Sequence, residues 1–160
     1  MLRRCALFTA LFFIAQISGA SLVVWLDNNP VGIAPAFFIE KIQHSIRALT
    51  IALPALAATG LMATVVSTFL ERRERVRFNL LVAASLCALT GAVLTAVGNV
   101  PLNERILTWS SASPPANWPE LVATWRQFHL ARTLLTTGSL VLLILAVLCS
   151  ERRPSRARRN

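Results

Sequence analysis

Four apolar stretches of about twenty residues each constrain this chain more than any other feature. They cover residues 7–26, 46–70, 78–97 and 130–149. A helix rises 1.5 Å per residue, so about twenty apolar residues cross the ~30 Å hydrocarbon core of a bilayer. Because a segment in lipid must satisfy its own backbone hydrogen bonds, each stretch is predicted to be a helix. The sequence therefore predicts an all-α integral membrane protein with four spans.

The lengths of the connections predict how these spans are arranged. Residues 71–77 form a connection so short that the second and third spans must make an antiparallel hairpin. An up-down-up-down four-helix bundle follows, with an extended external loop between the third and fourth helices. Residues 1–150 are expected to form this single membrane domain, and residues 151–160 a basic cytosolic tail. Pro54 removes a backbone donor inside the second span, which predicts a kink there.

Basic residues are unequally distributed between alternate gaps. The net charge is +9, and eleven of the 16 Lys and Arg residues lie before the first span, in the connection at 71–77 or in the tail. By the positive-inside rule, both termini and this connection are predicted to be cytosolic, in a multi-pass protein of the cell membrane. A basic tail also suits anionic lipid head groups, whereas this distribution argues against nucleic acid as a partner. The eleven residues are Arg3, Arg4, Arg72, Arg73, Arg75, Arg77, Arg152, Arg153, Arg156, Arg158 and Arg159.

The first apolar stretch also has features of a signal peptide. Arg3 and Arg4 precede it, and the small residues 18–20 are typical of a cleavage site. The apolar run nevertheless continues to Leu26, and Trp25 lies where an interfacial anchor is expected. We therefore expect this stretch to be retained as the first span.

The segment between the third and fourth spans differs from the rest of the chain. Residues 98–128 contain three of the four tryptophans, Trp109, Trp118 and Trp125. These side chains either anchor the protein at the membrane interface or form the walls of a ligand site. Residues 117–120 carry Asn, Pro and Glu in an order typical of a helix start. A helix that begins there is predicted to continue into the fourth span.

One face of this last helix is polar. At helical spacing, Trp125, His129 and Arg132 lie on the same side. A guanidinium inside a span is costly unless it extends to the head groups or finds a partner. Two arrangements remain open: Arg132 reaches the outer surface, or it faces the interior and donates to Asn99, Asn103, Glu104 or a ligand. His129 is either an interfacial histidine or a general base, because imidazole titrates near neutral pH.

Candidate metal ligands lie at the same side of the predicted bundle. His44, Glu40 and His129 all lie near that end and offer two imidazoles and a carboxylate. Their spacing does not match a recognised ligand motif. No metal is therefore predicted.

The second half of the chain resembles the anthrone oxygenase-like family of small four-helix membrane proteins. The resemblance is carried by the N-x-P-x-N run that begins at Asn99 and by the W-x3-H-x2-R run from Trp125 to Arg132, before a last apolar helix. The family pattern extends from about Leu11 to Cys149. Characterised fungal members oxidise anthrones to anthraquinones with molecular oxygen and no prosthetic group, whereas many bacterial members form a domain of unknown function.

The resemblance implies a pocket made by Asn99, Asn103, Trp125, His129 and Arg132. It also implies no bound cofactor, with molecular oxygen as co-substrate. An anthrone would lose a carbon-bound proton to give an enolate that reacts with oxygen, which requires a base, donors for the oxyanion and aromatic walls. The predicted site residues are His129 and Arg132 as catalytic groups, and Asn99, Asn103, Trp109 and Trp125 as substrate-binding groups.

Three classes of function remain compatible with the sequence. The first is a cofactor-independent oxygenase acting on a lipophilic aromatic compound, and the second is a non-catalytic membrane binding or accessory protein that uses the same pocket. The third, a small transporter component, is disfavoured because no charged residue lies near the middle of a predicted span. The expected partners are membrane lipid and a lipophilic small molecule that enters a pocket facing the outer leaflet; the sequence indicates no oligomeric state.

Overall fold

The structure is a computed structural model that describes residues 1–151, with side chains described through Cys149. The predicted basic tail therefore lies almost entirely outside the described residues. Every regular element of the described part is helical, as predicted. The helices are α1 (Leu2–Asp27), α2 (Pro35–Leu49), α3 (Ala52–Leu70), α4 (Arg75–Leu94), the π-helix η1 (Thr95–Asn99), α5 (Val100–Leu107) and α6 (Trp118–Glu151).

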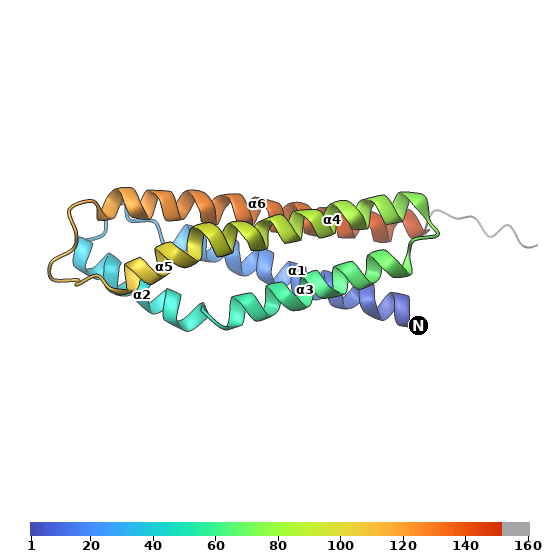
Figure 1. Ribbon diagram of the computed structural model, residues 1–160, viewed down its shortest axis with the longest axis horizontal. Coiled ribbons are helices and arrows are strands. Elements are labelled where there is room, and N and C mark those ends of the chain that lie inside the picture. The colour runs from blue at the N-terminus through green and yellow to red at the C-terminus, as the bar shows by residue number, and fades with distance from the viewer. Residues whose placement is uncertain (152–160) are drawn as a thin grey trace, which may run out of the picture.

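The long helices form one elongated bundle (Figure 1). Within it, α1 packs against α3 and α6, and α4 packs against the same two helices. The N-terminus and the α3–α4 connection lie at one end, here called the arginine end after residues 71–77. The connections at residues 28–34 and 108–117 lie at the other, here called the loop end (Figure 1).

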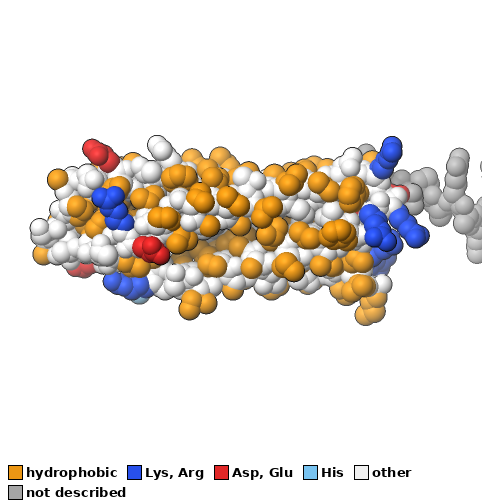
Figure 2. Space-filling model, viewed as in Figure 1, with side chains coloured by type: hydrophobic (Ala, Val, Ile, Leu, Met, Phe, Trp, Pro, Cys, Tyr) orange, Lys and Arg blue, Asp and Glu red, His pale blue; other side chains and the backbone are white. Residues whose placement is uncertain are grey.

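Four helical segments of the described chain are long and apolar enough to cross a membrane. Large hydrophobic side chains on them point outward, including Phe8 at 69% exposure and Phe69 at 65%. Figure 2 shows one face of the bundle, with hydrophobic side chains over its middle and charged side chains gathered toward the two ends. This confirms a multi-pass membrane protein. The segments are Leu2–Asp27, Ala52–Leu70, Arg75–Leu107 and Trp118–Cys149.

The second predicted span is interrupted rather than kinked. Residues 46–49 belong to α2, which ends at Leu49, and α3 begins only at Ala52. Pro54 explains the break: it has no N–H to donate to the carbonyl four residues earlier, and its ring crowds that carbonyl. The predicted boundaries of 46–70 are therefore corrected to 52–70.

The third span is longer than the predicted 78–97. The helix continues beyond α4 through the wider π turn η1 and ends at Leu107. Pro101 lies two residues after the end of η1, and because proline disrupts regular α-helical bonding in the preceding turn, it accounts for the widening there. The fourth helix begins at Trp118, which places Pro119 and Glu120 in its first turn as predicted. The expected extended loop thus reduces to residues 108–117.

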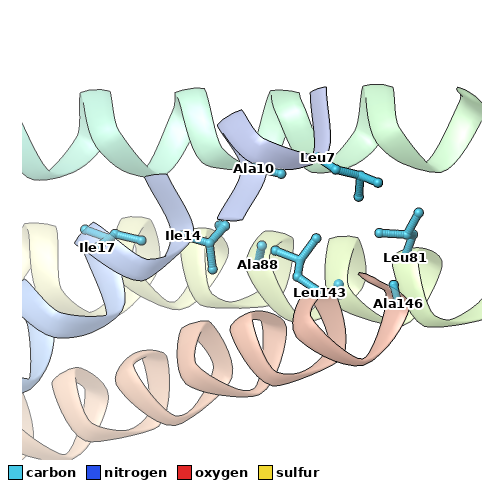
Figure 3. Close-up of a cluster of buried hydrophobic side chains, with 9 residues drawn as sticks. Leu7, Ala10, Ile14, Ile17, Leu81, Ala88, Leu143 and Ala146 are labelled. Carbon is cyan, nitrogen blue, oxygen red and sulfur yellow. The ribbon is translucent and has the colours of Figure 1, made fainter. Parts of the chain in front are cut away.

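A hydrophobic cluster fills the bundle toward the arginine end (Figure 3). Ile14 of α1, Leu81 of α4 and Leu143 of α6 all point into the interior between the helices and are almost completely buried. Ser139 adds an interhelical bond by donating to the Ala84 carbonyl at 2.9 Å. Since the hydrophobic effect gives little drive between helices in lipid, this close packing and hydrogen bonding hold the spans together.

An ion pair closes the bundle at the arginine end. Arg77 donates through Nη1 to the Glu71 carboxylate at 2.9 Å, and through Nε to the Ala146 carbonyl at 3.1 Å. The Glu71 side chain is only 3% exposed. These bonds tie the α3–α4 connection to α6.

Candidate functional site

A cavity of about 390 Å³ lies in the loop-end half of the bundle, between all six α-helices and η1. Most of its wall is aliphatic. The polar side chains of its wall come mainly from η1, α5 and α6. Five of the six predicted site residues line it: Asn99, Asn103, Trp125, His129 and Arg132.

His129 is completely buried on α6. Its Nε2 lies 2.9 Å from the Ser21 carbonyl of α1, and because a carbonyl only accepts, Nε2 carries the proton. Nδ1 is then the acceptor, and an Arg132 Nη2 lies 3.0 Å from it. The Trp125 ring packs against the imidazole with 4.8 Å between ring centroids. Both ring nitrogens therefore have hydrogen-bond partners within the protein.

Arg132 faces the interior of the bundle and is 9% exposed. Of the two arrangements left open by the sequence, the structure has the interior one. Besides His129, its only side-chain partner among the described residues is the Ser21 hydroxyl, at a long 3.4 Å from Nη1. The acids Glu71 and Asp27 form ion pairs with Arg3, Arg77 and Lys41, and not with Arg132. Arg132 is thus a buried guanidinium with no described carboxylate as counter-ion.

The asparagines bind Trp125 rather than Arg132. Asn103 Oδ1 accepts from the Trp125 indole nitrogen at 2.6 Å, and Asn99 donates to the Trp125 carbonyl at 3.1 Å. The expectation that Arg132 donates to Asn103 is therefore wrong for the described conformation. Gly98 lets α6 come this close, because a Cβ there would lie 2.4 Å from the Phe128 ring. The π turn and this glycine together bring Asn99 against Trp125.

Three buried side-chain atoms of the described residues have no hydrogen-bond partner, and all three belong to residues of the cavity wall. They are the acceptors Asn28 Oδ1 and Asn99 Oδ1 and the donor Arg132 Nε. Buried polar atoms are almost always satisfied, because leaving one unpaired costs about 1–3 kcal/mol. An occupant with both donors and acceptors would remove this cost.

Trp109 and Trp118 do not line the cavity. They pack against a second buried cluster nearer the loop end, where the Trp118 and Phe38 rings are 5.6 Å apart. The Trp109 carbonyl accepts from Gln43 Nε2 at 2.9 Å, which ties α2 to the loop after α5. Of the two options for the tryptophans, a cavity wall applies only to Trp125. No group of three potential metal-ligating side chains occurs among the described residues.

Sequence reasoning missed the contribution of α1 to this site. Ser21 supplies both a carbonyl and a hydroxyl, and Asn28 supplies an unpartnered acceptor. Arg126 fixes this end of α1 by donating to the Trp25 carbonyl at 3.0 Å and to the Asn28 carbonyl at 2.5 Å. Small polar residues such as Ser21 within an apolar span signal an interior face, but nothing local indicates that they meet α6.

Taken together, four membrane-spanning helices around a mostly aliphatic cavity with several unpartnered polar groups define a multi-pass membrane protein with a candidate small-molecule site. Residues 43–142 match the family model for anthrone oxygenase, and the chain belongs to that family. The matched region contains all six predicted site residues, whereas Ser21 and Asn28 lie outside it. No curated protein and no solved structure matches the chain.

Proposed function

We propose that this protein is a cofactor-independent oxygenase that binds a flat, lipophilic aromatic compound of the anthrone type in the cavity. One observation carries the proposal: the three residues with unpartnered buried atoms, Asn28, Asn99 and Arg132, all line one mostly aliphatic cavity. Its volume of about 390 Å³ suits a small-molecule site, for which about 300–1,000 Å³ is typical.

The wall groups are complementary to a phenolic aromatic ketone. A ligand carbonyl oxygen accepts from Arg132 Nε, and phenolic hydroxyls donate to the Oδ1 atoms of Asn28 and Asn99. The flat ring system packs on the aliphatic walls and against Trp125. Membrane partitioning concentrates such a compound where the protein resides.

The chemistry requires only a base and an oxyanion site. Loss of one carbon-bound proton from the anthrone gives an enolate, whose oxygen Arg132 stabilises. As Arg132 turns toward that oxygen, it releases Nδ1 of His129, which takes the proton. The enolate carbon reduces molecular oxygen and combines with it to give a hydroperoxide. Loss of the second proton from the same carbon then cleaves the O–O bond, so that one anthrone and one dioxygen yield one anthraquinone and one water.

Non-catalytic binding of the same class of compound is the second candidate. It is favoured by the fact that both ring nitrogens of His129 are already hydrogen-bonded, to Ser21 and Arg132. A protein that only binds or hands over a lipophilic aromatic needs the cavity but no free base.

The two candidates are distinguished with purified protein in nanodiscs. Oxygen consumption and quinone absorbance are followed with anthrone, after subtraction of the rate in nanodiscs without protein. An oxygenase loses about 10²–10⁴-fold in rate on His129→Ala, while His44→Ala, which changes an exposed histidine, keeps the full rate. Saturable quenching of tryptophan fluorescence by 1,8-dihydroxyanthraquinone, a redox-stable probe, reports binding separately.

Saturable quenching without any oxidation above background would favour the binding protein. Linear quenching that is equal in wild type and Arg132→Gln would mean simple partitioning of the probe into lipid. That result would reject both candidates.

A further inference from the structure

We propose that the ligand enters the cavity sideways from the hydrocarbon core of the membrane, through an opening between α3 and the α4–η1–α5 segment. This opening, here called the lateral mouth, is bordered by Pro54, Ala58, Ala92, Ala96 and Val100. The inference rests on the proposed function, in which the cavity binds a lipophilic aromatic compound, and adds the route and the residues that select for size.

The exposure of the lining residues shows on which side the cavity reaches the surface. On the α1 and α6 side, Asn28, Trp125 and His129 are at most 3% exposed. On the opposite side, all five residues of the lateral mouth line the cavity and are also exposed. The void is therefore closed toward α1 and α6 and open between α3 and the α4–η1–α5 segment.

Apolar packing blocks both paths along the bundle axis. Toward the loop end, Phe38, Ile106 and Val122 are completely buried in the second cluster. Gln43 reinforces this closure, because its Nε2 donates to the carbonyls of both Ile106 and Trp109 at 2.9 Å. Toward the arginine end, the cluster of Figure 3 fills the bundle from Ile17 onward. Water at either end thus has no open path to the cavity along the axis.

The lateral mouth has the chemistry of a lipid-facing entrance. Its residues lie within or immediately beside the membrane-spanning segments Ala52–Leu70 and Arg75–Leu107. All five are apolar, and three are alanines, whose short side chains leave room between the helices. Neighbouring side chains are large, hydrophobic and exposed, including Ile51, immediately before α3, at 79% and Val97 of η1 at 65%. A flat aromatic molecule dissolved in the acyl chains meets no polar barrier there.

Both backbone irregularities of the fold border this mouth. The helix break at residues 50–51 precedes Pro54, and the π turn η1 contains Ala96. Without these irregularities, each helix would continue in a straight line past the mouth. A break and a wide turn instead change the direction of the chain there. The positions of these irregularities explain why the helices leave an opening at this level of the bundle.

The test uses stopped-flow quenching of tryptophan fluorescence in nanodiscs mixed with vesicles that contain 1,8-dihydroxyanthraquinone. Ala58→Phe and Ala96→Phe place a large side chain on opposite rims of the mouth. Each should slow both association and dissociation of the probe by at least about tenfold, while Kd changes much less, because a narrowed entrance affects both directions equally. Ala55→Phe and Val93→Phe are the matched controls, since each adds bulk at an exposed position one turn away that does not line the cavity. Their rates should equal the wild-type rates.

Arg132→Gln separates this inference from the proposed function. If it weakens probe binding while both rim variants exchange the probe at wild-type rates, the ligand site stands and lateral entry is overturned. Rim variants that raise Kd without slowing dissociation would also overturn it, because they would be filling the cavity rather than narrowing its entrance. If wild type itself shows no saturable quenching, the proposed function fails, and the entry route fails with it.

Discussion

The two halves of this bundle are built differently. The half toward the arginine end has regular helices, a tightly packed core around Ile14 and Leu143, and a closed ion pair. The half toward the loop end contains the helix break, the π turn and the cavity. All three unpartnered buried side-chain atoms of the described residues lie in this second half.

Two arginines, the partly buried Arg77 and the buried Arg132, illustrate the difference. Arg77 has a carboxylate at 2.9 Å and a backbone carbonyl at 3.1 Å, so its charge and donors are matched. Arg132 is buried without a described counter-ion and with Nε free. Natural proteins depart from full satisfaction mainly at functional sites and compensate elsewhere. We infer that one half stabilises the fold and that the other half is arranged for a ligand.

The largest expected effects come from neutralising each arginine in turn, which tests whether the two halves have different roles. Arg77→Gln should destabilise the protein by up to about 3–5 kcal/mol, because it leaves the buried Glu71 carboxylate with only the 4.0 Å ion pair to the exposed Arg3. Arg132→Gln should leave stability unchanged or raise it, and should lower anthrone oxidation by about 10²–10³-fold, as for removal of an oxyanion donor. Thermal unfolding in detergent and oxidation rates in nanodiscs measure the two effects. Equal destabilisation by both substitutions would mean that Arg132 is a structural residue.

A cavity made in the packed half tests whether that half carries stability alone. Leu143→Ala removes a completely buried side chain from the cluster of Figure 3 and should destabilise the protein by about 3 kcal/mol. Probe affinity should be unchanged below the unfolding temperature, because Leu143 does not line the cavity. A large loss of affinity in the folded variant would show that the two halves are not independent.

Substitution of two glycines compares the stability effect of a close helix approach beside the site with that of an open position elsewhere. Gly98→Ala should destabilise by about 1–3 kcal/mol, because its Cβ would overlap the Phe128 ring. Gly138→Ala has nothing within 4 Å of the new Cβ and should be neutral or stabilising by up to about 1 kcal/mol. Chemical denaturation of both variants gives the comparison. If Gly98→Ala left the free energy of unfolding unchanged, α6 and η1 would be able to move apart without loss of stability.

The smallest expected effect is a coupling within the site. Trp125→Phe removes the indole donor to Asn103, so Trp125→Phe and Asn103→Leu should be non-additive by about 0.5–1.5 kcal/mol. Arg132→Leu and Asn103→Leu, which share no hydrogen bond in the structure, should be closer to additive. The measurement is a pair of double-mutant cycles on thermal stability. The reverse ranking would restore the Arg132–Asn103 pairing that the sequence suggested.

Much of the fold could be predicted because its determinants are local. Apolar runs of spanning length must be helical in lipid, so the number of spans and the all-α class follow from contiguous sequence. The start of α6 at Trp118 was also predictable, because Asn117, Pro119 and Glu120 act on adjacent backbone groups. Pro54 signalled irregular backbone, yet the complete break there, like the π turn before Pro101, depends on how neighbouring helices accommodate the lost hydrogen bond.

The candidate site also has some features that the local sequence determined and others that only the tertiary structure decided. Sequence alone determined that Trp125, His129 and Arg132 share a face of α6, because their spacing matches the helical repeat. Only the tertiary structure decided that this face meets Ser21, which lies more than 100 residues away along the chain. Helical periodicity specifies which side chains point together but not the order and rotation of helices that bring distant faces into contact. For that physical reason the polar stripe was predictable, whereas its partners on α1, the exclusion of Trp109 and the opening between α3 and α4–η1–α5 were not.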